Sequence, residues 1–380
     1  AFTTLTTLLL LICSNGLINA ERVVCSYSSS AVKRPGEYSF QLSDIPLSLC
    51  THVVYDHFDI DYYTYEFLAK DLEFDVWDNG LQKFADLKRN KTDLKLLISI
   101  RSPILLRVAG EAIARKTFIA NVLSYVEWMK VDGVELFWSG SDEEVLYSLI
   151  EELRSSFVAA GHPSTEVNIL AQIDQPVVDH ARLCRLADYV HLLVTGERRP
   201  IYRGNSLTPT VNTTLDVGEH KNVSFERALD HYIEASCPAE KIVLTTLLIA
   251  QTYTLGNVEN RDPPKELSTF CTLTKGMAFC VYMDMCQKFN ESGWTFGWDD
   301  AEGLAPHARQ GNVWVSYENE ASVGRKGEIA RSKQLAGVYV LSLELDDYRG
   351  KCGSGLFPLI KAISRSFRGT ANDEAATHSN

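Results

Sequence analysis

The feature that most restricts the fold of this chain is a regular alternation of short apolar segments with longer amphipathic ones. Eight apolar, β-branched segments have the character of strands, at residues 22–27, 51–58, 94–100, 133–138, 167–173, 189–195, 242–249 and 337–345. Segments of helical periodicity lie between them, such as 112–130, 141–160 and 224–235. Strands that alternate with helices become parallel strands joined by right-handed crossovers. The pattern therefore predicts an α/β fold, a (β/α)8 barrel.

The chain of 380 residues is longer than a barrel requires. The interval between the seventh and eighth strands is too long for a loop and has aromatic residues and cysteines of its own. We therefore expect a small α+β subdomain at 254–335, inserted into a barrel at 21–253 and 336–368. Residues 1–20 are uncharged and contain a run of leucines too short to span a bilayer, which predicts a secretory signal peptide rather than a buried strand or a membrane anchor. The polar tail 369–380 predicts disorder.

Cysteine content, sequons and charge indicate the compartment. Eight of the nine cysteines follow residue 20, an even number suited to an oxidising environment. Four Asn-x-Ser/Thr sequons, at Asn90, Asn212, Asn222 and Asn290, predict N-glycosylation. A net charge of -12 argues against binding to nucleic acid or anionic membranes. No C-x-x-C or H-E-x-x-H motif occurs in the sequence, so we expect no metal and no cofactor. These features predict a secreted, extracellular monomer that is not inserted in a membrane.

The fourth predicted strand carries the most informative motif. The segment Val131 to Ser139 reads V-D-G-V-E-L-F-W-S. It resembles the D-G-x-D-x-D-x-E strand of the family-18 glycoside hydrolases, the chitinases. Asp132 matches the first Asp of that motif, while its second Asp, third Asp and final Glu are replaced by Glu135, Phe137 and Ser139. Strand side chains alternate between faces, so these three should share the face that points into the barrel mouth. The resemblance implies that the family's proton donor has become a serine.

Other segments carry the same resemblance in the same order. Cys25-Ser26-Tyr27 and the segment 49–55 resemble the family's first two strands, 311–317 resembles its G-x-x-W-V-x-Y, and 345–352 resembles its L-D-D-F-x-G-x-C. The resemblance spans roughly 22–366 and implies the disulfides Cys25–Cys50 and Cys286–Cys352. By elimination, the remaining cysteines pair as Cys184–Cys237 and Cys271–Cys280, with buried free thiols as the alternative.

The departures from the family pattern cluster at the predicted C-terminal ends of the strands, where such barrels have their active sites. The resemblance implies hydrolysis assisted by the acetamide of the sugar, which needs an acid, an orienting carboxylate and a tyrosine hydroxyl. The Tyr and Asp of the family's sixth strand are replaced by Thr195 and Gly196, and its sugar-stacking Trp by Leu341. In its third strand, S-x-G-G becomes a segment containing Arg101. We therefore expect a catalytically inactive chitinase-like protein. The tripeptide Trp138-Ser139-Gly140, preceded by D-G-V, resembles most closely the arthropod chitinase-like proteins, including mite group-18 allergens, and then the imaginal disc growth factors.

Three functions remain open at this point: signalling or growth-factor-like action on a cell-surface receptor, binding of chitin or another glycan as a lectin, and residual hydrolysis. The candidate ligand-binding side chains are Tyr27, His57, Arg101, Trp294 and Trp298. Glu135 is expected to be a buried carboxylate paired with Arg101, and Phe137 to fill the former pocket. Four other tryptophans are expected to pack in the interior: Trp77, Trp128, Trp138 and Trp314.

Overall fold

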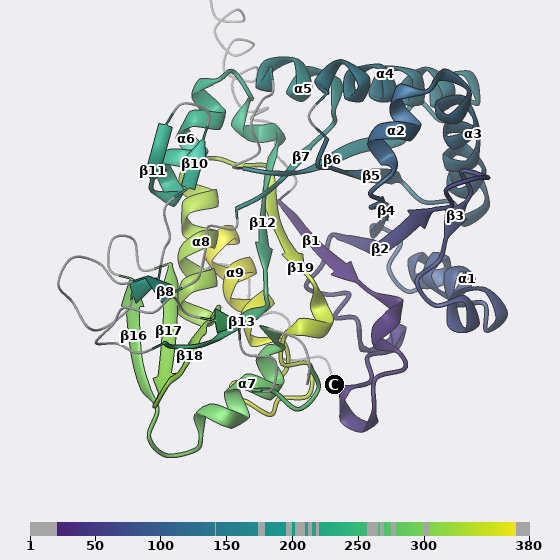
Figure 1. Cartoon of the computed structure of the whole chain (residues 1–380). Coiled ribbons are helices and arrows are strands. Elements are labelled where there is room, and N and C mark those ends of the chain that lie inside the picture. Colours follow the sequence, from purple (N-terminus) through teal and green to yellow (C-terminus); the bar gives the residue numbers. More distant parts are fainter. Residues whose placement is uncertain are drawn as a thin grey trace, which may run out of the picture.

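The computed structural model describes most of the chain after the predicted signal segment (Figure 1). The described residues are 21–140, 142–173, 179–194, 200–201, 210–211, 215–217, 220–256, 265–266, 270–274, 279–299 and 304–369. Within this part of the chain, no helix is long and apolar enough to cross a membrane.

Eight parallel strands close into a barrel, which confirms the predicted (β/α)8 fold. Strand β1 pairs with both β2 and β19, and these two ladders close the ring. The barrel strands are almost entirely buried, which explains why most of their residues are apolar on both faces rather than alternating between apolar and polar. In chain order they are β1 (Arg22–Tyr27), β2 (His52–Ile60), β4 (Lys95–Ile100), β5 (Gly133–Trp138), β6 (Glu166–Gln172), β7 (Val190–Leu193), β12 (Ile242–Leu247) and β19 (Gly337–Leu341).

Helices lie around the outside of the barrel, between successive strands (Figure 1). Their beginnings follow local capping rules: the Asp142 side chain accepts from Val145 N at the start of α4, and Ser224 accepts from Arg227 N at the start of α6. The helices are α1 (Gly80–Ala85), α2 (Leu105–Gly110), α3 (Ala112–Met129), α4 (Glu143–Ala159), α5 (His180–Leu186), α6 (Phe225–Glu234), α8 (Glu320–Ser332) and α9 (Pro358–Arg368). Short helical turns are η1 (Ser29–Ala31), η2 (Gly36–Tyr38), η3 (Leu42–Asp44), the π-helix η4 (Glu73–Trp77), η5 (Asp86–Arg89), η6 (Ala239–Lys241) and η7 (Leu343–Leu345).

A second sheet lies beside the barrel, at the lower left of Figure 1, between the seventh and eighth barrel strands in sequence. Its strands pair antiparallel in the order β14-β13-β18-β17-β16, with β15 on β13. They are β13 (Ala250–Thr254), β14 (Lys265–Glu266), β15 (Phe279–Cys280), β16 (Thr295–Asp299), β17 (Ala305–Gln310) and β18 (Val313–Ser316), accompanied by helix α7 (Tyr282–Phe289). Smaller antiparallel pairs involve β3 (Phe67–Leu68) on β2, β8 (Pro200–Ile201) with β9 (Thr210–Val211), and β10 (Leu215–Val217) with β11 (His220–Val223).

Helix α8 follows this sheet and packs against α9 on the outside of the barrel. The two helices approach closely at Gly327, where a Cβ atom would lie 2.5 Å from the carbonyl oxygen of Ile363. Glycine is therefore required at this crossing. The residue limits expected for the barrel and the inserted subdomain stay predictions.

Four disulfides join the chain, between the same cysteine pairs named from the sequence. Two of them, Cys25–Cys50 and Cys184–Cys237, lie within the barrel portion. Cys271–Cys280 closes a short loop of the second sheet, and Cys286–Cys352 ties helix α7 to the segment after β19. The last bridge fixes the second sheet to the barrel covalently.

Two of the four tryptophans expected in the interior lie at the surface instead. Trp138 and Trp314 are buried, and Trp314 stacks on His307 with ring centres 5.4 Å apart. Trp77 is 74% exposed on η4, and Trp128 is 51% exposed near the end of α3. The expectation that Trp77 and Trp128 pack in the core is therefore wrong, because both lie on the outward faces of surface helices.

Candidate functional site

Strand β5 presents its inner-face residues at increasing exposure from the barrel interior to the rim. Its register with β4 and β6 places Gly133, Glu135 and Phe137 on one face, and Ser139 follows directly after the strand. Glu135 is 0% exposed, Phe137 is half-buried and Ser139 is exposed. Phe137 is thus not a fully enclosed core residue. The residue that stands in place of the motif's Glu lies at the solvent end of the strand.

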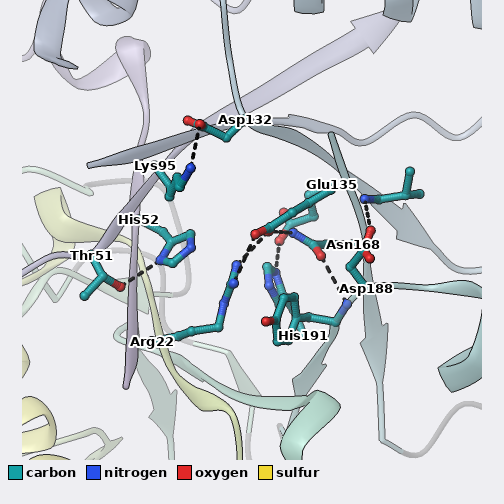
Figure 2. A network of polar contacts seen from close by, with 12 residues as sticks. Arg22, Thr51, His52, Lys95, Asp132, Glu135, Asn168, Asp188 and His191 are labelled. Atoms are coloured by element: carbon teal, nitrogen blue, oxygen red, sulfur yellow. Dashed lines mark hydrogen bonds and ion pairs between the residues drawn. The ribbon is translucent and has the colours of Figure 1, made fainter. Parts of the chain in front are cut away.

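The buried carboxylate of Glu135 contacts His191 of β7. Glu135 Oε2 lies 2.5 Å from His191 Nδ1, and both side chains are fully enclosed (Figure 2). Tyr339 of β19 packs its ring edge-on to His191, 5.1 Å between centres. Glu135 Oε1 and His191 Nε2 have no hydrogen-bond partner within the part of the chain that the structure describes. The two polar groups therefore pair through one atom each deep inside the barrel, and each keeps a second polar atom without a partner among the described residues.

Arg101 is not the partner of Glu135, which corrects the expectation from the sequence. In the β4–β5 ladder Ser99 lies opposite Glu135, so Arg101 lies two residues nearer the rim. Its guanidinium Nη2 is instead 3.4 Å from Asp56 Oδ1 on β2. Its Cζ lies 5.1 Å from the ring centre of Phe137, a cation–π arrangement. Arg101 and Phe137 together occupy the rim beside the end of β5.

His57 completes this rim cluster through Asp56. The imidazole Nδ1 of His57 is 3.0 Å from Asp56 Oδ1, and both side chains are largely buried. Burial alone would raise the pKa of the Asp56 carboxyl, but the hydrogen bond from His57 and the charge of Arg101 outweigh it and lower that pKa. Asp56 is therefore an ionised partner for two cationic or donor groups rather than a proton donor.

The other candidate ligand-binding residues are scattered. Tyr27 is fully buried and stacks on Phe84 at 6.3 Å between ring centres, and burial raises the pKa of its hydroxyl. Trp294 is half-buried and packs edge-on against Phe270 and Phe289. Trp298 of β16 is 42% exposed, which makes it the most exposed of these three aromatic side chains. Thr195 and Gly196 lie outside the described residues.

Leu341 lies at the end of β19 and is buried. It belongs to a small apolar cluster inside the barrel, with members including Val24, Val54 and Leu97. An aliphatic side chain in this position contributes packing to the interior and offers no aromatic face on which a sugar ring could stack.

The opposite end of the barrel holds a separate polar network (Figure 2). Arg22 of β1 forms a bidentate ion pair with Glu166 of β6 at 3.1 and 2.7 Å and lies 3.7 Å from the ring centre of Tyr189. Asn168 donates to the same Glu166 at 3.0 Å. Burial next to Arg22 lowers the pKa of His52 to about 2, so His52 is neutral there. In such barrels this end contributes stability rather than catalysis.

Asp132, the first Asp of the motif, belongs to this lower network. Its Oδ2 accepts a hydrogen bond from the backbone N–H of Leu96 at 2.8 Å and lies 2.6 Å from Lys88 Nζ, and its Oδ1 is 3.1 Å from Lys95 Nζ. Asp132 thus ties the starts of β4 and β5 together, at the far end of the strand from Ser139. His191, Arg22 and Glu166 were missed from the sequence, and the signal they carried was their alternation onto the inward strand faces.

Two of the four sequon asparagines lie at the surface. Asn90 and Asn290 have exposed side chains, at the ends of η5 and α7. Asn222 lies in β11, with a side chain that is not described, and Asn212 lies outside the described residues. Within the described ranges, no group of three or more His, Cys, Asp or Glu side chains is arranged to hold a metal ion.

Comparison with known proteins identifies the family that this chain matches. A family model described as Glycosyl hydrolases family 18 matches residues 22–346. An endochitinase of Manduca sexta is 26% identical over 381 aligned positions, which cover 90% of this chain and 67% of the endochitinase. The crystal structure of the Ostrinia furnacalis Group IV chitinase superposes with a TM-score of 0.79 at 25% identity, over 92% of this chain and 100% of that one. A structure of human YKL-39, described as a pseudo-chitinase with retained chitooligosaccharide binding properties, shares the fold with a TM-score of 0.76 at 22% identity, over 92% and 100% of the two chains.

Proposed function

Since this chain belongs to glycosyl hydrolases family 18, we propose that it is a chitinase-like member that does not hydrolyse chitin. The observation that carries the proposal is Ser139, the exposed residue at the rim end of β5, in the place of the motif's proton-donating Glu. A serine hydroxyl cannot protonate a glycosidic oxygen at neutral pH. The protein would act through its surface on a cell-surface receptor or on a weakly bound glycan, like mite group-18 allergens or imaginal disc growth factors.

The magnitude of the loss supports inactivity. A positioned general acid contributes about 10²–10⁴-fold to the rate, and removing one group that stabilises developing charge costs about 10²–10³-fold. Phe137 stands in place of a further carboxylate and has no proton or charge to offer. Losing both contributions leaves little rate above the uncatalysed reaction.

Glu135 cannot replace the missing acid. It precedes Ser139 by four residues, which corresponds to ~13 Å along a strand. Its side chain is fully enclosed and its Oε2 contacts His191. A substrate oxygen at the rim is therefore out of reach of this carboxyl group.

The rim cluster argues for weak binding of chitooligosaccharides. Arg101 and Phe137 lie together beside the end of β5, and Leu341 provides no stacking face. Aromatic rings that stack on sugars, with unpaired polar groups nearby, are what a tight glycan site requires. We expect dissociation constants of about 1 mM or weaker, near −4 kcal/mol.

A second candidate function is a lectin that binds glycans through the second sheet. The exposed Trp298 on β16 favours it, because a half-exposed indole can stack on a sugar ring. The description of YKL-39 as a pseudo-chitinase that binds chitooligosaccharides is also consistent with this role. Calorimetry with chitooligosaccharides separates the two: micromolar binding that is lost in Trp298→Ala would favour the lectin.

Turnover of a fluorogenic chitooligosaccharide tests the proposal directly. The purified protein should give no rate above buffer, with the Manduca sexta endochitinase as positive control. The variant Glu135→Gln is the matched control for residual chemistry, because it keeps the shape of the side chain and removes its acid. Turnover by the parent that disappears in Glu135→Gln would identify a hydrolase with a displaced acid and overturn the proposal.

The cellular setting belongs to the same proposal. We infer secretion as an extracellular monomer, after removal of residues 1–20, and N-glycosylation at sequons such as Asn90 and Asn290. Four disulfides, including Cys25–Cys50, support an oxidising compartment. We also infer an inserted subdomain at 254–335 and a polar tail at 369–380.

A further inference from the structure

A surface pocket with a volume of about 510 Å³ lies between the segment before β2 and the turns η4, α1 and η5. Five apolar side chains line it, Leu42, Ile45, Leu47, Phe74 and Leu87, together with the polar residues Gln41, Ser43, Lys83 and Asn90. The pocket is on the outside of the barrel and contains none of the residues of the rim cluster. Leu42 and Leu47 are partly exposed to solvent, and leaving apolar surface of this kind in contact with water costs free energy.

Asn90 is part of the wall of this pocket. Its side chain is exposed, and it heads the sequon Asn90-Lys91-Thr92, in which Thr92 is exposed as well. Oligosaccharides are attached to the side-chain nitrogen of such an asparagine. A sugar linked to Asn90 would therefore begin at the edge of this pocket.

The sequon is held rigidly against the pocket. The backbone N–H of Asn90 donates to Leu87 O at 3.1 Å. Lys91 Nζ donates to Leu47 O at 3.1 Å and to Cys50 O at 2.9 Å. Since Leu47 and Leu87 are themselves pocket residues, attachment point and wall move as one unit. Holding the first sugar near its binding surface lowers the entropy cost of packing it there.

We propose that Asn90 carries an N-linked glycan whose first sugars lie in this pocket and cover its apolar walls. An N-acetylglucosamine ring has an apolar face and a polar rim, which suits a pocket with Phe74 and Leu87 within it and Ser43 and Lys83 beside them. The volume is within the range of about 300–1,000 Å³ that holds small organic ligands. The inference rests on the proposed secretion and is independent of whether the barrel hydrolyses chitin.

The experiment expresses the full chain in insect cells behind a heterologous signal sequence, so that glycosylation does not depend on the native one. Two variants remove the sequon through different residues, Asn90→Gln and Thr92→Ala. The matched control Asn290→Gln removes another exposed sequon that does not line this pocket. Glycopeptide mass spectrometry reports occupancy, hydrogen exchange reports protection of residues 41–47 and 83–90, and calorimetry reports Tm.

The parent should carry a glycan at Asn90. Both Asn90→Gln and Thr92→Ala should lower the Tm by about 1–2 °C and speed exchange in 41–47 and 83–90, whereas Asn290→Gln should leave both readouts unchanged. An unmodified Asn90 in the secreted parent would overturn the proposal. So would an occupied Asn90 whose removal leaves exchange in 41–47 unaltered, because the sugars would then extend into solvent.

Discussion

Replacing Glu135 with leucine should destabilise the barrel more than replacing the whole Glu135–His191 pair. The two side chains are 0% exposed and their Oε2 and Nδ1 atoms are 2.5 Å apart. In Glu135→Leu, the imidazole stays buried without its partner. In the double variant with His191→Leu, neither polar group remains.

The magnitudes follow from burial. Removing one member of a buried pair costs about 3–5 kcal/mol, because the remaining group keeps its desolvation penalty. Glu135→Gln retains a carbonyl oxygen for the imidazole and should cost only about 1–2 kcal/mol. The double variant also removes Glu135 Oε1 and His191 Nε2, which have no hydrogen-bond partner in the described structure. It should therefore recover at least about 2 kcal/mol relative to Glu135→Leu.

Urea unfolding at fixed pH with the disulfides intact measures five proteins: the parent, Glu135→Gln, Glu135→Leu, His191→Leu and the double variant. The parent, the two leucine variants and the double variant form a double-mutant cycle that gives the coupling free energy. The parent should be the most stable protein, with Glu135→Gln slightly below it. Glu135→Leu should be less stable than both Glu135→Gln and the double variant. A double variant as unstable as the sum of the two single variants would refute the reasoning, because the two groups would then contribute independently.

Restoring the acid alone, Ser139→Glu, should produce no chitinase turnover; a clear rate above the parent would show that the rest of the site is intact. Because burial lowers the pKa of His52 to about 2, the folded state resists protonation, so stability should fall as pH drops below about 6.5. In His52→Gln, the Tm should decline less steeply as the pH falls, and an unchanged slope of Tm against pH would contradict this prediction. Removing Cys286–Cys352, which links positions 66 apart, should cost about 4 kcal/mol of unfolding free energy in urea. A loss under 1 kcal/mol would count against that reasoning.

The barrel could be predicted from sequence because its signals are local. Strands β1 and β5 have the predicted limits, 22–27 and 133–138. Both are mostly apolar segments flanked by polar residues, and this pattern is contained within the segment itself. Helices α3 and α4 were predicted within two residues for the same reason.

The pairing of buried charges could not be predicted, because it depends on register across strands. Arg101 and Glu135 both point inward from neighbouring strands, yet the ladder aligns Glu135 with Ser99. His191 reaches Glu135 from β7, two strands away. No sequence spacing records which of these inward side chains meet in the barrel.

The exposure of Trp77 and Trp128 was missed for a related reason. Both lie in helical segments with apolar residues on several sides, so composition alone does not identify the buried face. Trp128 contacts Tyr125 edge-on at 5.7 Å, and their contact lies at the helix surface rather than beneath it.

Exposure increases along β5, so residues that stabilise the fold and the residue at the place of the motif's acid lie at different ends of one short strand. A substitution at exposed Ser139 removes no packing and leaves no buried partner unpaired. Residues of many kinds can therefore occupy this position with little change in the stability of the fold. Glu135 is enclosed against His191, so substitutions at that position change the stability of the fold. A barrel built in this way can exchange the functional group at its mouth by single steps while its interior holds the fold constant, so its activity is more easily altered than its architecture.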